Sequence, residues 1–256
     1  MENNVDFLHR SRILYGAEAM EKLRRSHILL AGAGGVGGYA AEAITRGGIG
    51  NLTVYDPDKV HLTNLNRQLI ALESTLDKYK TDCLRERLLQ INPALNIIGV
   101  NQSLTPENIP AILDQGNFDY VIDAIDSIND KCFLLAECHR RNIPVIAAMG
   151  AGCRLDASAM QYADISKTFN CRLAKNVRAI LKKEYNIAKG IECVFSTEPP
   201  LPHGVLQENP NERPTIGSTS FMPGITGLML AAKVLNKLAG IEEEKNSNIK
   251  VQRCAD

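Results

Sequence analysis

The chain has 256 residues, of which 45% are hydrophobic and 23% charged, a composition typical of a soluble globular protein with one large core. Lys and Arg total 29, as do Asp and Glu, so the formal net charge is zero; no global field favours a polyanionic partner, although a local basic face stays possible. Seven scattered cysteines without a C-x-x-C pair, no secretory segment and no long uncharged run favour a cytoplasmic protein with reduced thiols, without a membrane span or a Cys-ligated zinc.

Apolar runs typical of buried strands alternate with helical patterns through the first 150 residues. Strands are predicted at 27–31, 52–55, 95–100, 120–122 and 145–148, and helices at 35–46, 78–90, 106–114 and 127–141. This alternation predicts an α/β fold: a Rossmann-like, mostly parallel sheet with helices on both faces. Its ligands are expected beyond the carboxyl ends of the strands.

After residue 150 the pattern changes. Segments 154–165 and 193–196 are predicted to extend the sheet with antiparallel strands, and helices are predicted at 169–185 and 224–238. The stretch 198–215 holds five prolines without periodicity, which predicts a mobile surface loop. We expect a single domain over 1–256, with a nucleotide-binding core at 1–150 and a C-terminal extension at 151–256.

The first predicted strand runs into GAGGVGG at 32–38. Gly32 would permit the tight turn after the strand, and Gly34 and Gly35 would let the backbone approach a phosphate. Gly37 or Gly38 would let the following helix pack on the sheet, and the helix N-terminus favours an anion. This indicates a nucleotide site, with a nicotinamide cofactor as the default and a glycine-rich packing turn as the alternative.

The segment after Asp56 weakens the interpretation of the site as one for a nicotinamide cofactor. Asp56 ends the second predicted strand, where it can bond a ribose. The sequence DPDKVHLTNLNRQ at 56–68 then brings Asn64, Arg67 and Gln68, and Lys80 follows at the start of a helix. Such cations and amides suit a triphosphate.

Two carboxylates follow the fourth predicted strand, in VIDAIDS at 121–127. Asp126 is predicted to hold Mg²⁺ against the phosphates, and Asp123 could do the same. Either carboxylate could instead cap the helix that begins at Ser127.

Together, GAGGVGG, Asp56, NLNRQ, Lys80 and the DAIDS aspartate resemble the ThiF/MoeB/HesA superfamily of ubiquitin-activating-type adenylating enzymes. RILYG at 12–16, GAGCRLD at 150–156, ADISKT at 163–168 and CVFSTE at 193–198 are similar to its tRNA threonylcarbamoyladenosine dehydratase branch. That resemblance implies an ATP-dependent dehydration, or cyclisation, of threonylcarbamoyladenosine beside the anticodon, with release of AMP and pyrophosphate.

The resemblance also implies roles for single residues. Asn64, Arg67 and Lys80 would grip the triphosphate, Asp126 would organise Mg²⁺, and Arg12 would act across the interface of a homodimer. The expected catalytic set is Arg12, Arg67, Lys80 and Asp126. A partner of the sulfur-transfer or cysteine desulfurase type is a further expectation, and zinc is not expected. The expected nucleotide-binding residues are Gly32, Gly34, Gly35, Gly37, Asp56, Asp58, Asn64, Gln68 and Lys80.

Some positions depart from the pattern of relatives. Ser127 and Lys131 stand where many sulfur-carrier activators have Asn and Arg. Cys153 occupies a place that the branch usually gives to glycine, and we interpret it as a small buried residue. Cys193 is similar to a cysteine of the branch, and a buried strand thiol is the interpretation we prefer.

One helix offers independent support for a tRNA substrate. In 169–185 the basic residues fall largely along one side and the apolar residues along another. A one-sided basic stripe suits a phosphate backbone, and an ordinary solvated face is the alternative. The predicted tRNA-binding residues are Arg172, Lys175, Arg178, Lys182 and Lys183.

Three classes of function stay open. The preferred one is the tRNA dehydratase, and the second is an enzyme that adenylates the C-terminus of a ubiquitin-like sulfur-carrier protein. The third is a nucleotide-regulated binding protein without turnover, which Arg67, Lys80 and Asp126 disfavour together. The basic helix, ADISKT and CVFSTE favour the first class over the second, and a nicotinamide oxidoreductase ranks last.

Overall fold

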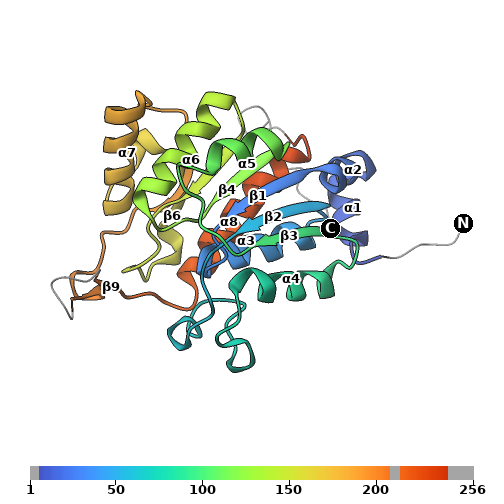
Figure 1. The fold of residues 1–256 in the computed structure, drawn as a ribbon, viewed down its shortest axis with the longest axis horizontal. Coiled ribbons are helices and arrows are strands. Elements are labelled where there is room, and N and C mark those ends of the chain that lie inside the picture. Colours follow the sequence, from blue (N-terminus) through green and yellow to red (C-terminus); the bar gives the residue numbers. More distant parts are fainter. Residues whose placement is uncertain (1–5, 208–213, 242–256) are drawn as a thin grey trace, which may run out of the picture.

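A seven-stranded sheet forms the middle layer of the computed structural model, which describes residues 6–207 and 214–241 (Figure 1). The strand order is β3-β2-β1-β4-β5-β7-β6; all neighbours pair in parallel except β6 and β7, which are antiparallel. The order of strands reverses between β1 and β4, the place where ligands bind in such sheets. The strands are β1 (His27–Ala31), β2 (Asn51–Tyr55), β3 (Asn96–Val100), β4 (Tyr120–Asp123), β5 (Val145–Ala148), β6 (Met160–Asp164) and β7 (Glu192–Ser196).

Helices cover both faces of the sheet, and β1 illustrates why. Ile28 and Leu30 pack in a core with residues of α2, α3, α4 and α8, whereas Leu29 and Ala31 pack with α5, α6 and α7. Alternate side chains of a strand point to opposite faces, so an apolar strand needs two cores. The helices are α1 (His9–Tyr15), α2 (Ala17–Arg25), α3 (Gly35–Arg46), α4 (Lys80–Ile91), α5 (Ile109–Gln115), α6 (Ile128–Arg141), α7 (Arg172–Tyr185) and α8 (Met222–Leu238).

Helix α8 packs tightly against α3 because glycine removes the side chain at the contact. A Cβ added to Gly227 would lie 2.3 Å from Val36 O and 2.9 Å from Ala40 N, which is closer than non-bonded atoms approach. The C-terminal helix therefore lies directly on the helix that follows the glycine loop.

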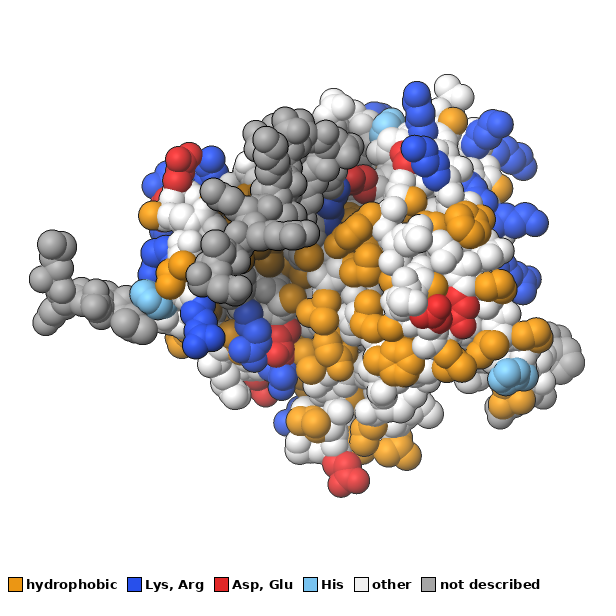
Figure 2. Space-filling view, turned by 180° about the vertical axis from the view of Figure 1, so that it is seen from behind, with side chains coloured by type: hydrophobic (Ala, Val, Ile, Leu, Met, Phe, Trp, Pro, Cys, Tyr) orange, Lys and Arg blue, Asp and Glu red, His pale blue; other side chains and the backbone are white. Residues whose placement is uncertain are grey.

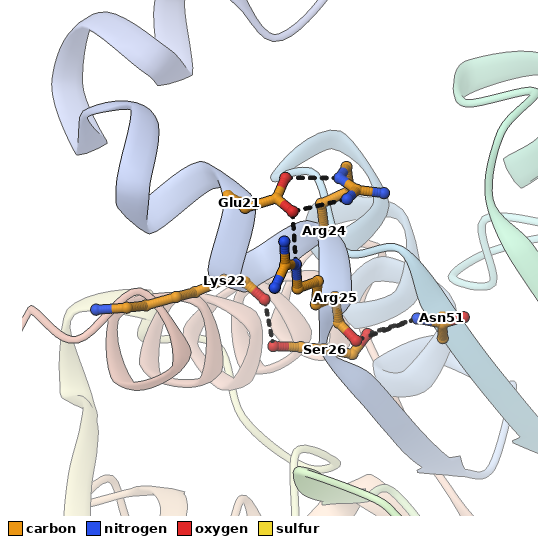
Figure 3. A network of polar contacts seen from close by, with 6 residues as sticks. All are labelled: Glu21, Lys22, Arg24, Arg25, Ser26 and Asn51. Atoms are coloured by element: carbon orange, nitrogen blue, oxygen red, sulfur yellow. Dashed lines mark hydrogen bonds and ion pairs between the residues drawn. The ribbon is translucent and has the colours of Figure 1, made fainter.

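At the edge of the sheet opposite the carboxyl ends, a polar network joins α2 to β1 and β2 (Figure 3). The carboxylate of Glu21 accepts from Arg24 at 2.7 Å and from Arg25 at 2.5 Å. Asn51 Nδ2 donates to the carbonyls of Arg25 and Ser26, each at 3.3 Å. These bonds fix the entry of the chain into β1.

The predicted fold is confirmed, including the helix at 35–46, but the predicted strand at 154–165 is wrong in its first half. Glu198 accepts from the backbone N–H groups of Leu155 and Asp156, and Asp156 accepts from Ser158 N. These side chains satisfy the backbone locally, so only Met160–Asp164 pairs as a strand. Helices α1 and α2 were not predicted, since they are short.

The predicted loop at 198–215 contains short regular structure. It holds a 3₁₀ turn and β8, and β8 pairs with β9 in an antiparallel hairpin. Residues 208–213 lie outside the described residues, and the mobility of the segment stays a prediction. The remaining short elements are η1 (Leu62–Asn64), η2 (Glu73–Thr75), η3 (Ala157–Ala159), η4 (Ile165–Lys167), η5 (Pro202–Gly204), β8 (Val205–Leu206) and β9 (Thr215–Ile216).

Within 6–207 and 214–241, none of the helices combines the length and apolar character that crossing a membrane requires.

Candidate active site

A cavity of about 400 Å³ opens at the carboxyl ends of β1, β2, β4 and β5. It is lined by the glycine loop, by Asp56 and by Lys80. It is also lined by residues 149–152, by Leu173 of α7, and by Ile216 and Ser218. The strand ends thus bring together segments that lie far apart in the sequence, as the predicted parallel sheet requires.

The glycines of the loop have different roles. Gly32 has φ +96°, and a Cβ there would lie 2.8 Å from Ala124 O, so the tight turn requires glycine. A Cβ on Gly37 would lie 1.8 Å from Gly32 O, and Gly37 does not line the cavity. Gly37 therefore packs α3 against the turn, which agrees with the packing role predicted for Gly37 or Gly38, and its place among the nucleotide-binding residues stays a prediction. At Gly34 the nearest atom to an added Cβ is Gln68 Nε2 at 3.7 Å, which leaves space for a bound phosphate.

Asp56 anchors the glycine loop. Its Oδ2 accepts from Ala33 N at 2.7 Å and its Oδ1 from Asp58 N at 2.8 Å. Burial raises the pKa of the Asp56 carboxyl, and the ammonium of Lys80 opposes that rise. Each oxygen of an ionised carboxylate has two lone pairs, so Asp56 keeps acceptor capacity toward the cavity for ribose hydroxyls.

Lys80 is 5% exposed and reaches the cavity wall from the start of α4. Its Nζ lies 2.7 Å from Asp58 Oδ2 and 4.0 Å from Asp56 Oδ1. The two carboxylates hold the ammonium beside the glycine loop, where it adds positive charge to the helix N-terminus.

Arg67 and Gln68 line the cavity, whereas Asn64 does not. The backbone N–H groups of Arg67 and Gln68 donate to Asn64 O at 3.1 and 2.9 Å, and Asn64 Oδ1 accepts from His61 N at 3.0 Å. Asn64 therefore shapes the turn that carries the other two residues, and its expected nucleotide contact stays a prediction. Gln68 is 8% exposed, and its Oε1 has no partner in the described part of the chain. A buried polar atom of this kind requires a partner, which fits a polar ligand in the cavity.

The two carboxylates of VIDAIDS have separate environments. Asp126 lines the cavity together with Ser127 and Asp130. Asp123 is 0% exposed, and its Oδ2 lies 2.6 Å from Lys131 Nζ. Its Oδ1 accepts from Ile125 N at 3.0 Å, and α6 begins after Ser127 without a side-chain cap. Both alternatives weighed for Asp123, a metal ligand and a helix cap, are therefore wrong.

A metal ion would have few protein ligands here. The described residues contain no group of three or more His, Cys, Asp or Glu side chains that could hold one. Mg²⁺ in nucleotide sites commonly takes one or two carboxylates, phosphate oxygens and water. Asp126 at the cavity wall fits that pattern.

Three buried cysteines lie in environments that disfavour the reactive thiolate. Burial raises the pKa of Cys132, Cys138 and Cys193 to about 12, so these thiols stay neutral near pH 7. The interpretations of Cys153 and Cys193 as buried residues are confirmed. Cys153 has φ +57°, a conformation that suits glycine, and its Sγ donates to Gly204 O at 3.1 Å.

Arg12 lies on α1 and pairs with Asp6 at 2.7 Å. It does not line the cavity of its own chain. Its action across a dimer interface stays a prediction.

The basic residues of α7 divide into two groups. Arg172, Lys175, Lys182 and Lys183 are exposed, and Figure 2 shows Lys and Arg side chains along the edge of the molecule that α7 forms, at the right of the view. Arg178 is only half-exposed, because its NH1 donates to Thr168 O at 2.9 Å and to Thr168 Oγ1. Arg178 thus holds the turn before α7, and its predicted contact with tRNA stays untested.

Helix α8 carries an apolar face toward solvent. Phe221 and Leu228 are 42% and 50% exposed, and Ile225 between them is half-buried. Their spacing of four and three residues places them on one side of the helix. Hydrophobic side chains cover the centre of the view in Figure 2.

The sheet order, glycine loop and cavity define a Rossmann-like nucleotide-binding protein. The ThiF family matches residues 8–253, and the chain belongs to that family. It is 40% identical to the tRNA threonylcarbamoyladenosine dehydratase of Bacillus subtilis, over 90% of this chain and 93% of the relative. It is 41% identical to the Escherichia coli protein of the same name, over 72% of this chain and 71% of the relative. The crystal structure of the E. coli dehydratase TcdA in complex with ATP matches with a TM-score of 0.84 and 34% identity, over 91% of this chain and 93% of that one.

Proposed function

We propose that this chain is an ATP-dependent dehydratase that cyclises threonylcarbamoyladenosine in tRNA beside the anticodon. The observation that carries the proposal is the cavity, in which the glycine loop, Arg67, Lys80 and Asp126 face one space. Identity to the named dehydratases extends over most of the chain, and the similar structure of TcdA was solved with ATP.

The reaction needs two displacements. An oxygen of the threonyl carboxylate attacks the α-phosphorus of ATP, the bond to the β-phosphate oxygen breaks, and pyrophosphate leaves. An internal nitrogen or oxygen of the carbamoyl group then attacks the activated carbonyl carbon, the bond to AMP breaks, and a proton passes to solvent. The net change is the loss of one water from the nucleoside. The carboxylate oxygen that attacked the α-phosphorus leaves as part of AMP.

The residues of the cavity support the first displacement. Gly34 directly precedes α3, and Gly35 is its first residue. Backbone N–H groups and the helix dipole at this end of the helix favour the phosphates. Arg67 and Lys80 offset the negative charge that grows on the oxygens as pyrophosphate leaves. Asp126 would hold Mg²⁺, which would polarise phosphate oxygens when bound.

Part of the cavity lining lies outside the predicted nucleotide-binding residues. Residues 149–152, Leu173 and Ser218 also line the cavity, and Leu173 belongs to α7. The threonyl carboxylate of the nucleoside would enter past these residues, from the α7 side. The exposed Arg172, Lys175, Lys182 and Lys183 then supply local positive charge for tRNA phosphates, which a chain of zero net charge lacks globally.

A homodimer is part of the proposal. Arg12 lies outside the cavity of its own chain, and a second copy would supply it across a two-fold interface. The exposed apolar face of α8, with Phe221 and Leu228, is a surface that such an interface would bury. Mixing Arg12→Ala subunits with Asp126→Ala subunits should restore activity in heterodimers; heterodimers that form without recovery would contradict action across the interface.

Formation of AMP tests the function directly. It should occur with tRNA that carries threonylcarbamoyladenosine and fail with unmodified tRNA and with a ubiquitin-like sulfur-carrier protein. AMP formed only with the carrier protein would replace the dehydratase by the carrier-adenylating enzyme. Calorimetry should also show tighter binding of ATP with Mg²⁺ than of NAD, and the reverse preference would contradict the nucleotide assignment.

A further inference from the structure

Lys131, on the first turn of α6, is one of the largest fully buried side chains in the described chain, and none of the steps above uses it. Its Nζ donates to Asp123 Oδ2 at 2.6 Å and to Ala148 O at 3.1 Å, and both charged side chains are 0% exposed. Desolvation cancels much of the attraction in such a pair, and apolar residues of similar volume often stabilise a core as well. Stability alone therefore gives no reason for the pair.

The contacts of Lys131 with Asp123 and with Ala148 O link two segments that line the cavity. Asp123 is the last residue of β4 and Ala148 the last of β5. The chain continues from these strand ends into residues 124–127 and 149–152, and both segments line the cavity. One ammonium group thus anchors both segments at their bases.

Asp123 also shapes the segment that carries Asp126. Its Oδ1 accepts from Ile125 N at 3.0 Å, so the carboxylate bends the backbone one residue before Asp126. Lys131 holds the other oxygen of the same carboxylate. The orientation of Asp126 therefore depends on a carboxylate that Lys131 fixes.

We propose that Lys131 and Asp123 are positioning residues, which hold Asp126 and the 149–152 backbone in place on either side of the nucleotide. Neither lines the cavity, so they touch neither ATP nor tRNA and act through the two wall segments. The inference rests on the proposed function, because it assigns Asp126 to the Mg²⁺ of the bound nucleotide.

The test separates position from stability. In Lys131→Met, Asp123 stays buried without its counter-ion, so the Tm should fall. In Lys131→Met/Asp123→Asn both charges are gone, so the Tm should recover. The kcat should stay about 100-fold low in both variants, since small misplacements of catalytic groups cost that much. Lys131→Arg, which keeps the positive charge, should retain more activity than Lys131→Met.

Calorimetry of ATP binding with and without Mg²⁺ provides a readout that needs no turnover. Mg²⁺ should tighten ATP binding to the wild-type protein and lose most of this effect in the double variant. Glu137→Gln/Arg141→Met is the matched control, because it removes an ion pair at the other end of α6. It should lower the Tm and leave the effect of Mg²⁺ unchanged.

A double variant with wild-type Tm, kcat and Mg²⁺ dependence would overturn the inference. Should the double variant not fold, Asp123→Asn, which keeps Lys131 and its bond to Ala148, carries the same measurements. The binding readout uses no tRNA. A failure of tRNA-dependent AMP formation would therefore contradict the proposed function, while the positioning role would still be decided by the Mg²⁺ dependence of ATP binding.

Discussion

Residues 6–150, predicted as the nucleotide-binding core, and residues 151–207 and 214–241, predicted as the C-terminal extension, use polar side chains differently. In the core, Arg67, Lys80 and Asp126 all line the cavity. In the extension, Arg178 bonds to the turn before α7, and Glu198 bonds to the backbone at 155–156. Parallel strands end at one edge, so residues that follow them share a site. Irregular backbone must instead be satisfied by nearby side chains.

The largest effect should come from the core. Asp126→Asn should lower kcat by ~10²–10³-fold, because removing one preorganised charge at a reacting phosphate has that size of effect. Asp130→Asn is the control, since Asp130 lines the same cavity from α6 and should lower kcat much less. Single-turnover AMP formation measures both. Equal losses in the two variants would contradict the assignment of Asp126.

The extension should respond to charge on its surface. Lys175→Glu/Lys182→Glu/Lys183→Glu should weaken tRNA binding and flatten its log–log salt dependence by about 0.9 for each lost phosphate contact. The affinity for ATP should not change, because these lysines are exposed on α7 outside the cavity. Binding titrations at several salt concentrations measure the slope.

Arg178→Ala sharpens this result as a matched control. It removes a positive charge from the same helix, but one that bonds to Thr168. We expect a lower Tm with an unchanged salt slope. A flatter salt dependence of tRNA binding in this variant would show that Arg178 contacts tRNA phosphates.

Two glycines of one loop should separate packing from binding. Gly37→Ala should destabilise the protein by ~1–3 kcal/mol or more, because its Cβ would lie 1.8 Å from Gly32 O. Gly34→Ala meets only Gln68 Nε2 at 3.7 Å, so stability should change by ~0.5 kcal/mol or less. ATP binding should weaken in Gly34→Ala. Urea unfolding and calorimetry distinguish the two, and similar stabilities would contradict the packing role of Gly37.

A smaller effect on stability than that of Gly37→Ala is expected at Cys153. Cys153→Ala keeps a side chain at positive φ and loses the Sγ contact. Cys153→Gly loses the same contact but removes the strain of a side chain at positive φ, and that strain destabilises the folded protein by ~1–2 kcal/mol. The glycine variant should therefore be more stable than the alanine variant, despite the greater freedom of its unfolded chain. Urea unfolding measures the order, and the reverse order would show that φ at this position carries no strain.

The sequence predicted the sheet and the glycine loop because both depend on local patterns. Apolar runs place the strands, and Gly37 must be glycine because an added Cβ would meet Gly32 O in the same loop. What could not be predicted is which partner a polar side chain finds in the folded chain. Arg178 matches an exposed stripe in sequence, and only its bond to Thr168 shows otherwise.

Asn64 and Lys131 show the same limit. Asn64 stands among nucleotide-binding residues in sequence, yet its side chain bonds to His61 N. Lys131 reads as an ordinary helical lysine until β5 brings Ala148 O to its ammonium. The position of Lys131 could have indicated its burial, because it lies one helical turn before Leu134 and Leu135, on the apolar side of α6.

The contact between α3 and α8 bears on the order in which the protein folds during synthesis. Leu230 and Val234 of α8 complete the core that Ile44 of α3 begins, and α8 is the last helix of the described chain. The glycine loop and α3 therefore leave the ribosome long before α8. Until α8 is synthesised, the apolar side of α3 that α8 will cover stays exposed. Contacts between such distant segments form slowly, and exposed apolar surface on nascent chains engages chaperones. Nascent chains stalled before residue 222 should be sensitive to proteases, and those that have released residue 238 should be resistant.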